Sequence, residues 1–338
     1  MNSRERVYAA LDFTGPDRLP TDLWALPSTW YGRAEAVDAL LAQYPRDFAG
    51  IPVENAFDIT GYTAGTLVDC WGCEWVNLQD GVIGEVKSSP LEHYDKLPAY
   101  RWPEIAFGPL WEAAPAAIAA QRDRFVLGWA GDPFERMQFL RGPANLYEDL
   151  ADPGCDAVYD LRDRVFAMLR RYTERWVRLD VDAVSFSDDW GSQRSLLISP
   201  AKWREFFKPK YREVFEIVKN AGKRLFFHSD GHIADIYPDL IELGVDALNS
   251  QVWCMGLDRL APFAGRVTFW GELDRQHVLP LGTPAEIRHC QQQMVDTFYR
   301  NGGLIGQSSV DKLSSLANLE AAVAGWWDAR LMIPHDDR

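Results

Sequence analysis

The sequence predicts an α/β protein of the (β/α)8 TIM-barrel type, with residues 1–338 forming a single domain. Three observations support this fold class. Short apolar segments alternate with longer helix-like segments through the C-terminal half of the chain. Polar residues follow these apolar segments directly. The chain also lacks the glycine-rich fingerprints G-x-G-x-x-G and G-x-x-x-x-G-K-[ST], so a barrel is favoured over a doubly wound sheet.

Helices are predicted where apolar residues recur every three or four positions. Val158, Leu161, Val165 and Met168 have this spacing. Gly244 is placed to end a later helix as its C-cap. The predicted helices are residues 156–179, 203–221, 233–243, 284–300 and 316–331.

Short apolar segments between and beside these helices predict buried strands. Helices that join such strands predict parallel pairing through helical crossovers. The tripeptide Val-Asp-Ala precedes two of the segments in matching places, at residues 181–183 and 245–247. The predicted strand segments are Val184–Phe186, Leu225–Phe227, Leu248, Val267–Trp270 and Leu304–Gly306.

Polar side chains stand where these predicted strands end. Active sites of α/β barrels are built at the carboxyl ends of the strands, so we expect these side chains to converge on one pocket. A single polar strand end would mean little, because loops are polar, but five in succession favour a site. The residues singled out are Asp188, Asp189, His228, Asp230, Gln251, Glu272 and Asp274.

Composition excludes several classes of partner and location. The net charge is −14 and no basic stripe is visible, so we expect no nucleic-acid partner. No apolar segment approaches eighteen residues and the N-terminus has no signal-peptide core, so we expect neither membrane insertion nor export. Five cysteines, an odd number, fit reduced thiols in the cytoplasm. Cys70 and Cys73 have C-x-x-C spacing, which leaves a metal or redox role open beside ordinary packing.

Several motifs together resemble the uroporphyrinogen decarboxylase superfamily, over nearly the whole chain. The opening residues 4–20 are part of the resemblance, and so are the later motifs Phe139–Gly142, Phe186–Gln193, Ile198–Pro200 with Trp203, His228–Gly231, Leu243–Asp246, Gly271–Asp274 and Gly302–Leu304. The resemblance implies the barrel of the uroporphyrinogen decarboxylase/methyltransferase type and a homodimer. It also implies one of two chemistries: decarboxylation of uroporphyrinogen without a cofactor, or methyl transfer involving a corrinoid carrier protein.

The chain departs from the decarboxylase branch at its N-terminal motif. True uroporphyrinogen decarboxylases carry a stretch of the form R-Q-A-G-R-Y, whose arginines pair with the substrate carboxylates. The matching residues here, 22–31, contain no arginine, and Trp24 and Trp30 stand in this stretch. The resemblance therefore favours the methyltransferase branch.

The chain also departs from the thiol-methylating branch, whose zinc is held by a histidine and cysteines. His228 matches the histidine, but Asp230 replaces the first cysteine, and residues 306–309 contain no cysteine. A zinc site could still form from His228, Asp230 and Glu272, because zinc accepts nitrogen and carboxylate oxygen. The alternatives are that His228 contacts the substrate directly, oriented by a neighbouring acid, or is only structural.

Each of the remaining candidate residues has two possible interpretations. Neighbouring residues of a strand point to opposite sides, so at most one of Asp188 and Asp189 can face the pocket, as a base or as a residue that orients His228. Trp24 and Trp190 could line a pocket for a methoxylated aromatic or a flat cofactor ring, or they could fill the core.

The sequence thus predicts an enzyme that moves a methyl group between a corrinoid protein and a small O- or N-methylated substrate, a thiol or a folate. His228, Asp230 and an acid of 188–189 would activate the leaving group, and Gln193, Gln251 and Glu272 would bind the substrate. Two alternatives stay open: a cofactor-independent decarboxylase, and a barrel that only binds a tetrapyrrole or corrinoid.

Overall fold

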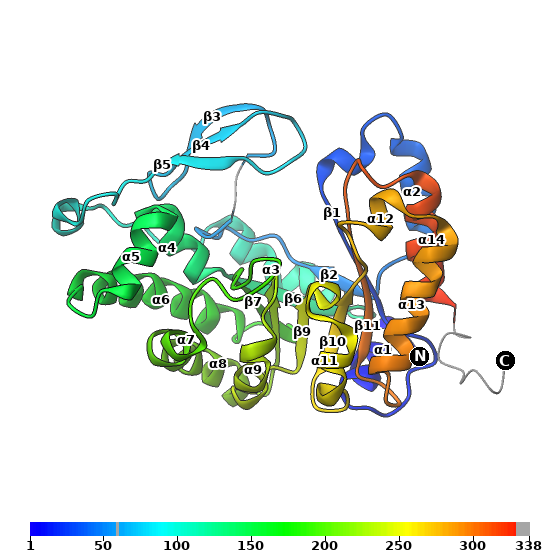
Figure 1. Ribbon diagram of the computed structural model, residues 1–338. Coiled ribbons are helices and arrows are strands. Elements are labelled where there is room, and N and C mark those ends of the chain that lie inside the picture. Colours follow the sequence, from blue (N-terminus) through cyan, green and yellow to red (C-terminus); the bar gives the residue numbers. More distant parts are fainter. Residues whose placement is uncertain (59–60, 329–338) are drawn as a thin grey trace.

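Eight parallel strands form one sheet that curves into a nearly closed barrel, in a computed structural model that describes residues 1–58 and 61–328 (Figure 1). This confirms the predicted fold class. Around the barrel the order is β1-β11-β10-β9-β8-β7-β6-β2. The bounds are β1 Thr21–Ala25, β2 Phe48–Gly50, β6 Phe125–Gly131, β7 Ala183–Ser187, β8 Arg224–Ser229, β9 Ala247–Ser250, β10 Thr268–Glu272 and β11 Leu304–Val310.

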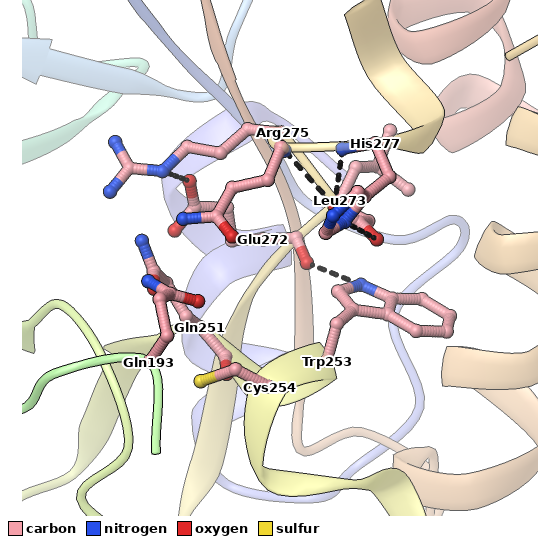
Figure 2. Close-up of a pocket in the computed structure, with 10 residues that line it drawn as sticks. Gln193, Gln251, Trp253, Cys254, Glu272, Leu273, Arg275 and His277 are labelled. Carbon is pink, nitrogen blue, oxygen red and sulfur yellow. Dashed lines mark hydrogen bonds and ion pairs between the residues drawn. The ribbon is translucent and has the colours of Figure 1, made fainter. Parts of the chain in front are cut away.

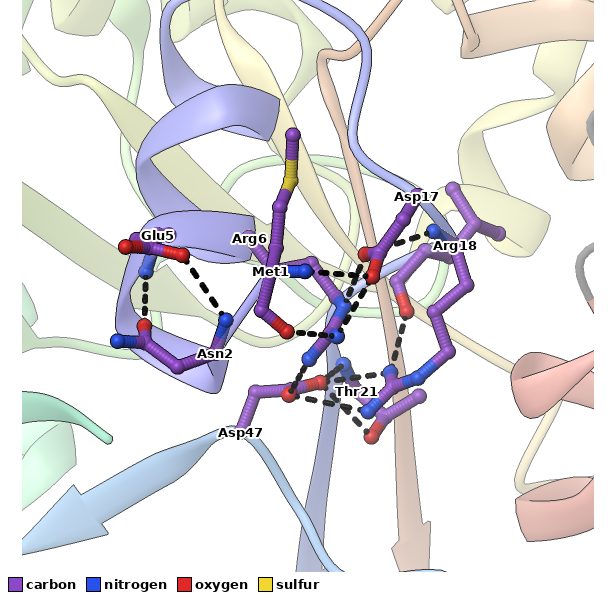
Figure 3. A network of polar contacts seen from close by, with 9 residues as sticks. Met1, Asn2, Glu5, Arg6, Asp17, Arg18, Thr21 and Asp47 are labelled. Atoms are coloured by element: carbon purple, nitrogen blue, oxygen red, sulfur yellow. Dashed lines mark hydrogen bonds and ion pairs between the residues drawn. The ribbon is translucent and has the colours of Figure 1, made fainter. Parts of the chain in front are cut away.

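A polar network closes the seam between the edge strands β1 and β2 at their amino ends (Figure 3). The backbone N–H of Asp47 donates to the carbonyl of Thr21 at 2.8 Å, and the Thr21 N–H donates to the Asp47 carboxylate at 2.8 Å. Arg6 and Arg18 pair with the same carboxylate at 2.7 and 2.8 Å. Strand β2 is only three residues long, and these contacts take the place of a longer strand pairing.

The barrel interior changes from apolar to polar along the strands. Side chains alternate between the two faces of a strand, so every second residue points inward. Near the amino ends these are aromatic, with Phe48, Phe125, Phe226 and Trp270 in ring contact. Helix α1 (Ser3–Leu11) adds Val7 and Leu11 to this cluster. Two residues after Phe226 and Trp270 the inward positions are His228 on β8 and Glu272 on β10, and these polar side chains belong to the site.

Helices surround the barrel and match the prediction with small changes. The predicted helix 203–221 is two helices, because Pro209 lies in the first turn of the second one. Residues 329–331 of the last predicted helix lie outside the described residues. The helices are α2 Ala34–Gln43, α3 Pro109–Ala119, α4 Pro133–Arg141, α5 Pro143–Ala151, α6 Asp156–Trp176, α7 Pro200–Phe206, α8 Lys208–Asn220, α9 Tyr237–Glu242, α10 Val252–Met255, α11 Leu257–Leu260, α12 Val278–Leu281, α13 Pro284–Phe298 and α14 Leu316–Trp327. In the described part of the chain no helix is long and apolar enough to cross a membrane.

An antiparallel sheet is inserted between β2 and β6 and lies beyond the carboxyl ends of the barrel strands (Figure 1). Its strands are β3 Gly65–Val68, β4 Glu74–Asn77 and β5 Glu85–Ser88. Cys70 and Cys73 lie in its first turn, where the Asp69 carboxylate accepts hydrogen bonds from the N–H groups of Trp71 and Cys73 at 2.9 Å. Burial raises the pKa of the Cys73 thiol to about 12. This arrangement fits the packing interpretation of the C-x-x-C pair.

Candidate active site

His228 stands at the centre of the carboxyl end of the barrel. It points inward from β8, and its Nε2 lies 3.5 Å from Asp189 and 3.7 Å from Asp230. Its Nδ1 lies 2.6 Å from the amide oxygen of Asn249 on the neighbouring strand β9. The amide nitrogen of Asn249 donates to the carbonyl of Trp270 at 2.6 Å, which leaves its oxygen to accept from the ring. Asn249 therefore holds the Nδ1 proton and turns Nε2 toward the two acids.

The two adjacent aspartates after β7 have separate places. Asp189 faces the barrel opening, and its carboxylate accepts a hydrogen bond from the N–H of Asp230 at 2.8 Å. Asp188 is fully buried on the other side, where it accepts from the N–H groups of Phe134 and Glu135 at 2.7 and 2.9 Å. It also bonds the Tyr211 hydroxyl on α8. The structure therefore brings Asp189, and not Asp188, into contact with His228.

Two glycines hold the loops of Asp189 and Asp230 together. Gly191 and Gly231 follow these aspartates, and their backbones touch. A Cβ on Gly231, whose φ is +77°, would lie 2.0 Å from the carbonyl oxygen of Gly191. No other residue fits such an approach. The Gly that follows the His-Ser-Asp sequence thus fixes how close the two acids come to the imidazole.

Charge interactions set the protonation of His228. Burial alone would lower the pKa of the imidazole, but the hydrogen bond and charge of Asp189 and the charge of Asp230 raise the pKa to about 9. The free site therefore holds an imidazolium at neutral pH. Such a group can donate a proton from Nε2 to a leaving atom, or exchange that proton for a metal ion.

Glu272 and Arg275 lie together in the cleft drawn in Figure 2, and the charge of His228 acts on Glu272. The Arg275 Nε lies 2.9 Å from the Glu272 carboxylate, and its guanidinium also pairs with Asp230. Burial raises the pKa of Glu272 to about 7, although the charge of Arg275 opposes this shift. The Glu272 carboxylate is thus ion-paired with Arg275, whereas the Asp189 carboxylate lies closer to the His228 imidazole.

A metal ion fits this site with a different ligand set from the one the sequence predicted. Among the described residues, ligand atoms of Asp189, His228 and Asp230 lie within 4.8 Å of one another. Three ligands and an open position are the arrangement of catalytic zinc sites. The Asp230 Oδ1 is buried without a hydrogen-bond partner, and the Nδ1 contact to Asn249 is the support that metal-bound histidines receive. Asp189 takes the place expected of Glu272.

The predicted substrate-binding residues divide between a cleft and the core. Gln193 and Gln251 bond each other at 2.7 Å and line a cleft with Glu272 and Arg275 (Figure 2). The Trp24 ring lies 5.0 Å from the His228 ring, edge to face.

Trp190 does not line this cleft. It is fully buried and stacks on Phe134 with ring centroids 3.8 Å apart. The core interpretation of Trp190 is therefore the correct one, because Phe134 of α4 stacks on its ring and Trp203 of α7 packs against it edge to face.

Four residues of the site were not singled out from the sequence: Asn249, Arg275, Asp132 and Glu135. Asp132 directly follows β6, so the rule that located His228 would have found it had strand 125–131 been predicted. Burial raises the pKa of Asp132 to about 7, and burial with neighbouring carboxylates raises the pKa of Glu135 well above its usual range. No sequence signal marks Arg275 as a site residue, because arginines are common in surface loops.

Comparisons with known proteins agree with the fold. The family model described as uroporphyrinogen decarboxylase (URO-D) matches residues 66–311, most of the chain. No curated protein matches it. A methyltransferase from Methanosarcina mazei is similar over 97% of this chain and 99% of that one, with 15% identity and a TM-score of 0.66. A D-psicose 3-epimerase from Clostridium cellulolyticum H10 is similar over 92% and 98%, with 11% identity and a TM-score of 0.45. The first similarity supports the barrel fold and nothing finer; the second is too weak to add to it.

Proposed function

The chain belongs to the uroporphyrinogen decarboxylase family, and on this premise we propose that it transfers a methyl group between a small O- or N-methylated substrate and the corrinoid of a carrier protein. One observation carries this proposal. An imidazole held by Asn249 directs its Nε2 toward Asp189 and Asp230 at the open end of the barrel. Methyl transfer needs such a group, because the atom that loses the methyl must be stabilised as it leaves.

His228 would activate the leaving atom. Its Nε2 proton can pass to the leaving oxygen or nitrogen, and Asp189 and Asp230 stabilise the imidazolium before transfer. Asn249 keeps the Nδ1 proton in place, so only Nε2 takes part. A zinc ion held by Asp189, His228 and Asp230 would supply the same activation as a Lewis acid.

The cleft beside Glu272 would position the substrate. Gln193 and Gln251 offer amide donors and acceptors there, and the Trp24 ring forms an apolar wall near the imidazole. Fixed placement of the methyl group in line with its acceptor contributes much of the rate in such reactions. The carrier protein would approach from the carboxyl ends of the strands, where this cleft opens.

A decarboxylase acting on a small acid is the second candidate. Asp132 and Glu272 have pKa values of about 7 and could protonate a carbanion. Uroporphyrinogen itself fits poorly. Arg275 is the arginine of the described cleft, and Arg33 in the N-terminal segment is bonded to the backbone carbonyls of Thr29, Asp311 and Ser314. An octa-anion would need several free guanidinium groups.

A corrinoid assay separates these functions. Purified protein is mixed with reduced cobalamin and a panel of methyl ethers, methylamines and methylated onium ions, and the absorbance change that accompanies cobalt methylation is followed. We expect methylation with at least one donor, and a rate lower by roughly 100-fold or more with His228→Asn. Carbon dioxide release from uroporphyrinogen or small acids, without cobalt methylation, would contradict the proposal in favour of a lyase. Metal analysis of the purified protein then tests the zinc ligands, and light scattering tests the expected homodimer.

A further inference from the structure

A buried carboxylate without a partner stands at the end of β6. Asp132 occupies the N-cap position of α4, where an aspartate normally accepts a hydrogen bond from the first turn of the helix. Here its side chain makes no capping hydrogen bond. The residue is 3% exposed, and its Oδ1 is buried with no hydrogen-bond partner. Such a group is costly to bury, so its presence calls for a ligand or a proton.

Asp188 explains why Asp132 is free. The N–H groups of Phe134 and Glu135, which Asp132 would otherwise cap, donate to the Asp188 carboxylate from the neighbouring strand end. The pairing of β6 with β7 is also irregular between Trp129 and Gly131, and such bulges re-aim the residues that follow. Both features release the Asp132 carboxylate from a structural role.

Glu135 adds a second carboxylate to the same place. It lies in the first turn of α4, and no described residue donates a hydrogen bond to its carboxylate or forms an ion pair with it. Asp132, Asp188, Asp189 and Asp230 all act on it electrostatically. Negative groups from three strand ends therefore meet around Glu135.

The nearby cations are already engaged. Arg136 pairs with Asp69 at 2.8 Å. His228 faces Asp189 and Asp230, and Arg275 is held by Asp230 and Glu272. Asp58, beyond β2, adds another carboxylate that acts on Asp132. The charge of Arg136 also acts on Asp132, but the carboxyl groups around Asp132 and Glu135 outnumber the described cations, and neither of the two forms an ion pair.

An aromatic ring stands on the same strand end. Trp129 points inward from β6 and is half-buried, and its indole N–H donates to the Ser187 hydroxyl at 3.0 Å, which fixes the ring. Aromatic faces attract organic cations. The described ligand atoms of Asp132 and Glu135 belong to no group of three close enough to hold a metal ion. A larger cation with spread charge fits this wall better than a compact metal.

We propose that Asp132 and Glu135 bind an ammonium group of the substrate, and that the transferred methyl comes from a separate oxygen or nitrogen of the same small molecule, which His228 protonates as it leaves. This inference rests on the proposed methyl transfer and narrows its substrate class. The cation would lie against Trp129 and the two carboxylates, with the methylated oxygen or nitrogen toward the imidazole side of the opening.

A matched pair of probes tests the proposal by calorimetry, without any corrinoid. Choline and 3,3-dimethyl-1-butanol have the same shape, and they differ in the charge of the central atom. We expect wild-type protein to bind choline at least tenfold more tightly than the alcohol. In the double variant Asp132→Asn/Glu135→Gln the preference should fall below threefold. As a control, Glu148→Gln removes one negative charge from an exposed position of α5 and should keep the wild-type preference.

Two results would overturn the proposal: choline binding no tighter than the alcohol in the wild type, or an unchanged preference in the double variant. Loss of folding would not be mistaken for either. Removing two carboxylates from a negative cluster should leave the melting temperature equal to or above that of the wild type. Cobalt methylation by neutral ethers alone would contradict this inference and keep the proposed function. Choline selectivity without any methyl transfer would support the cation site and contradict the proposed methyl-transfer function.

Discussion

The two ends of the barrel use charged residues in opposite ways. At the amino end, both oxygens of the Asp47 carboxylate are saturated (Figure 3). Arg6 and Arg18 donate to one oxygen at 2.7 and 3.0 Å, and Arg18 and Thr21 donate to the other at 2.8 Å each. At the carboxyl end, one buried oxygen each of Asp132 and Asp230 has no hydrogen-bond partner, and the buried Glu272 carboxylate is held by an ion pair with Arg275.

This difference shows which charges serve the fold and which serve chemistry. A satisfied buried ion network keeps strands together, because its removal leaves a charge unpaired. An unsatisfied group costs stability and is retained where a ligand or proton completes it. We therefore assign the amino end to stability and the carboxyl end to function.

The largest expected effect on stability comes from Asp47→Ala. The change leaves Arg6 and Arg18 unpaired at the seam and should lower the free energy of unfolding by about 3 kcal/mol or more. Chemical denaturation measures this loss. A loss within 1 kcal/mol would mean that the seam network is dispensable, and the contrast between the two ends would fail.

Zinc affinity should depend steeply on pH. With a pKa of about 9, His228 must lose a proton before its Nε2 can bind a metal. One proton released predicts that affinity rises about tenfold for each pH unit between 6 and 8. Competition against a chromophoric chelator gives the values. A flat profile in wild-type protein, or an unchanged affinity in His228→Asn, would remove His228 from the ligand set.

The adjacent aspartates allow a matched comparison. Asp188→Ala leaves two backbone N–H groups and the Tyr211 hydroxyl without their acceptor, so we expect a stability loss of about 1–3 kcal/mol. Asp189→Ala should change stability less, because Asp189 faces the opening, but should weaken zinc binding. Denaturation and zinc titration of both variants provide the test. Equal effects of the two changes on both measurements would contradict their separate places.

The stability contributions of the two barrel ends should also change with pH in opposite directions. Asp132 and Glu272 have pKa values raised to about 7, so the folded protein holds protons that the unfolded chain has released. Stability should therefore fall as the pH rises from about 5 to 8. Asp17, whose bond to Arg6 lowers its pKa to about 2, acts in reverse, and its contribution is lost only in strong acid. Melting curves across this range should flatten in Asp132→Asn/Glu272→Gln; an unchanged slope would contradict the assignment.

The sequence predicted the part of the molecule in which pattern and packing agree. Segments such as 225–227 are buried on both faces and are followed at once by polar residues, so the strand and its functional end were both visible. Strand β2 is three residues long, and β3 and β5 are largely exposed, so neither carries an apolar pattern. Because strand 125–131 was not predicted from the sequence, Asp132 and Glu135 were not identified as site residues.

The composition of the site depended on side-chain geometry that sequence does not encode. Adjacent side chains at the end of β7 point in opposite directions, and the sequence could not tell which of Asp188 and Asp189 faces the site. Glu272 is in the predicted place, but the loop residue Arg275 claims its carboxylate, and Asp189 stands nearer to His228 instead. Trp190 directly follows the site residue Asp189 in the sequence, yet its ring packs against Phe134 of α4 in the core.

The most direct test of this account is cobalt methylation by His228→Asn and Asp47→Asn, compared per folded molecule with the wild type and the same methyl donor. We expect Asp47→Asn to keep the wild-type rate at temperatures where it stays folded, and His228→Asn to lose roughly 100-fold or more. A His228→Asn protein that transfers methyl groups at the wild-type rate would contradict the central claim that the imidazole at the carboxyl end carries the chemistry.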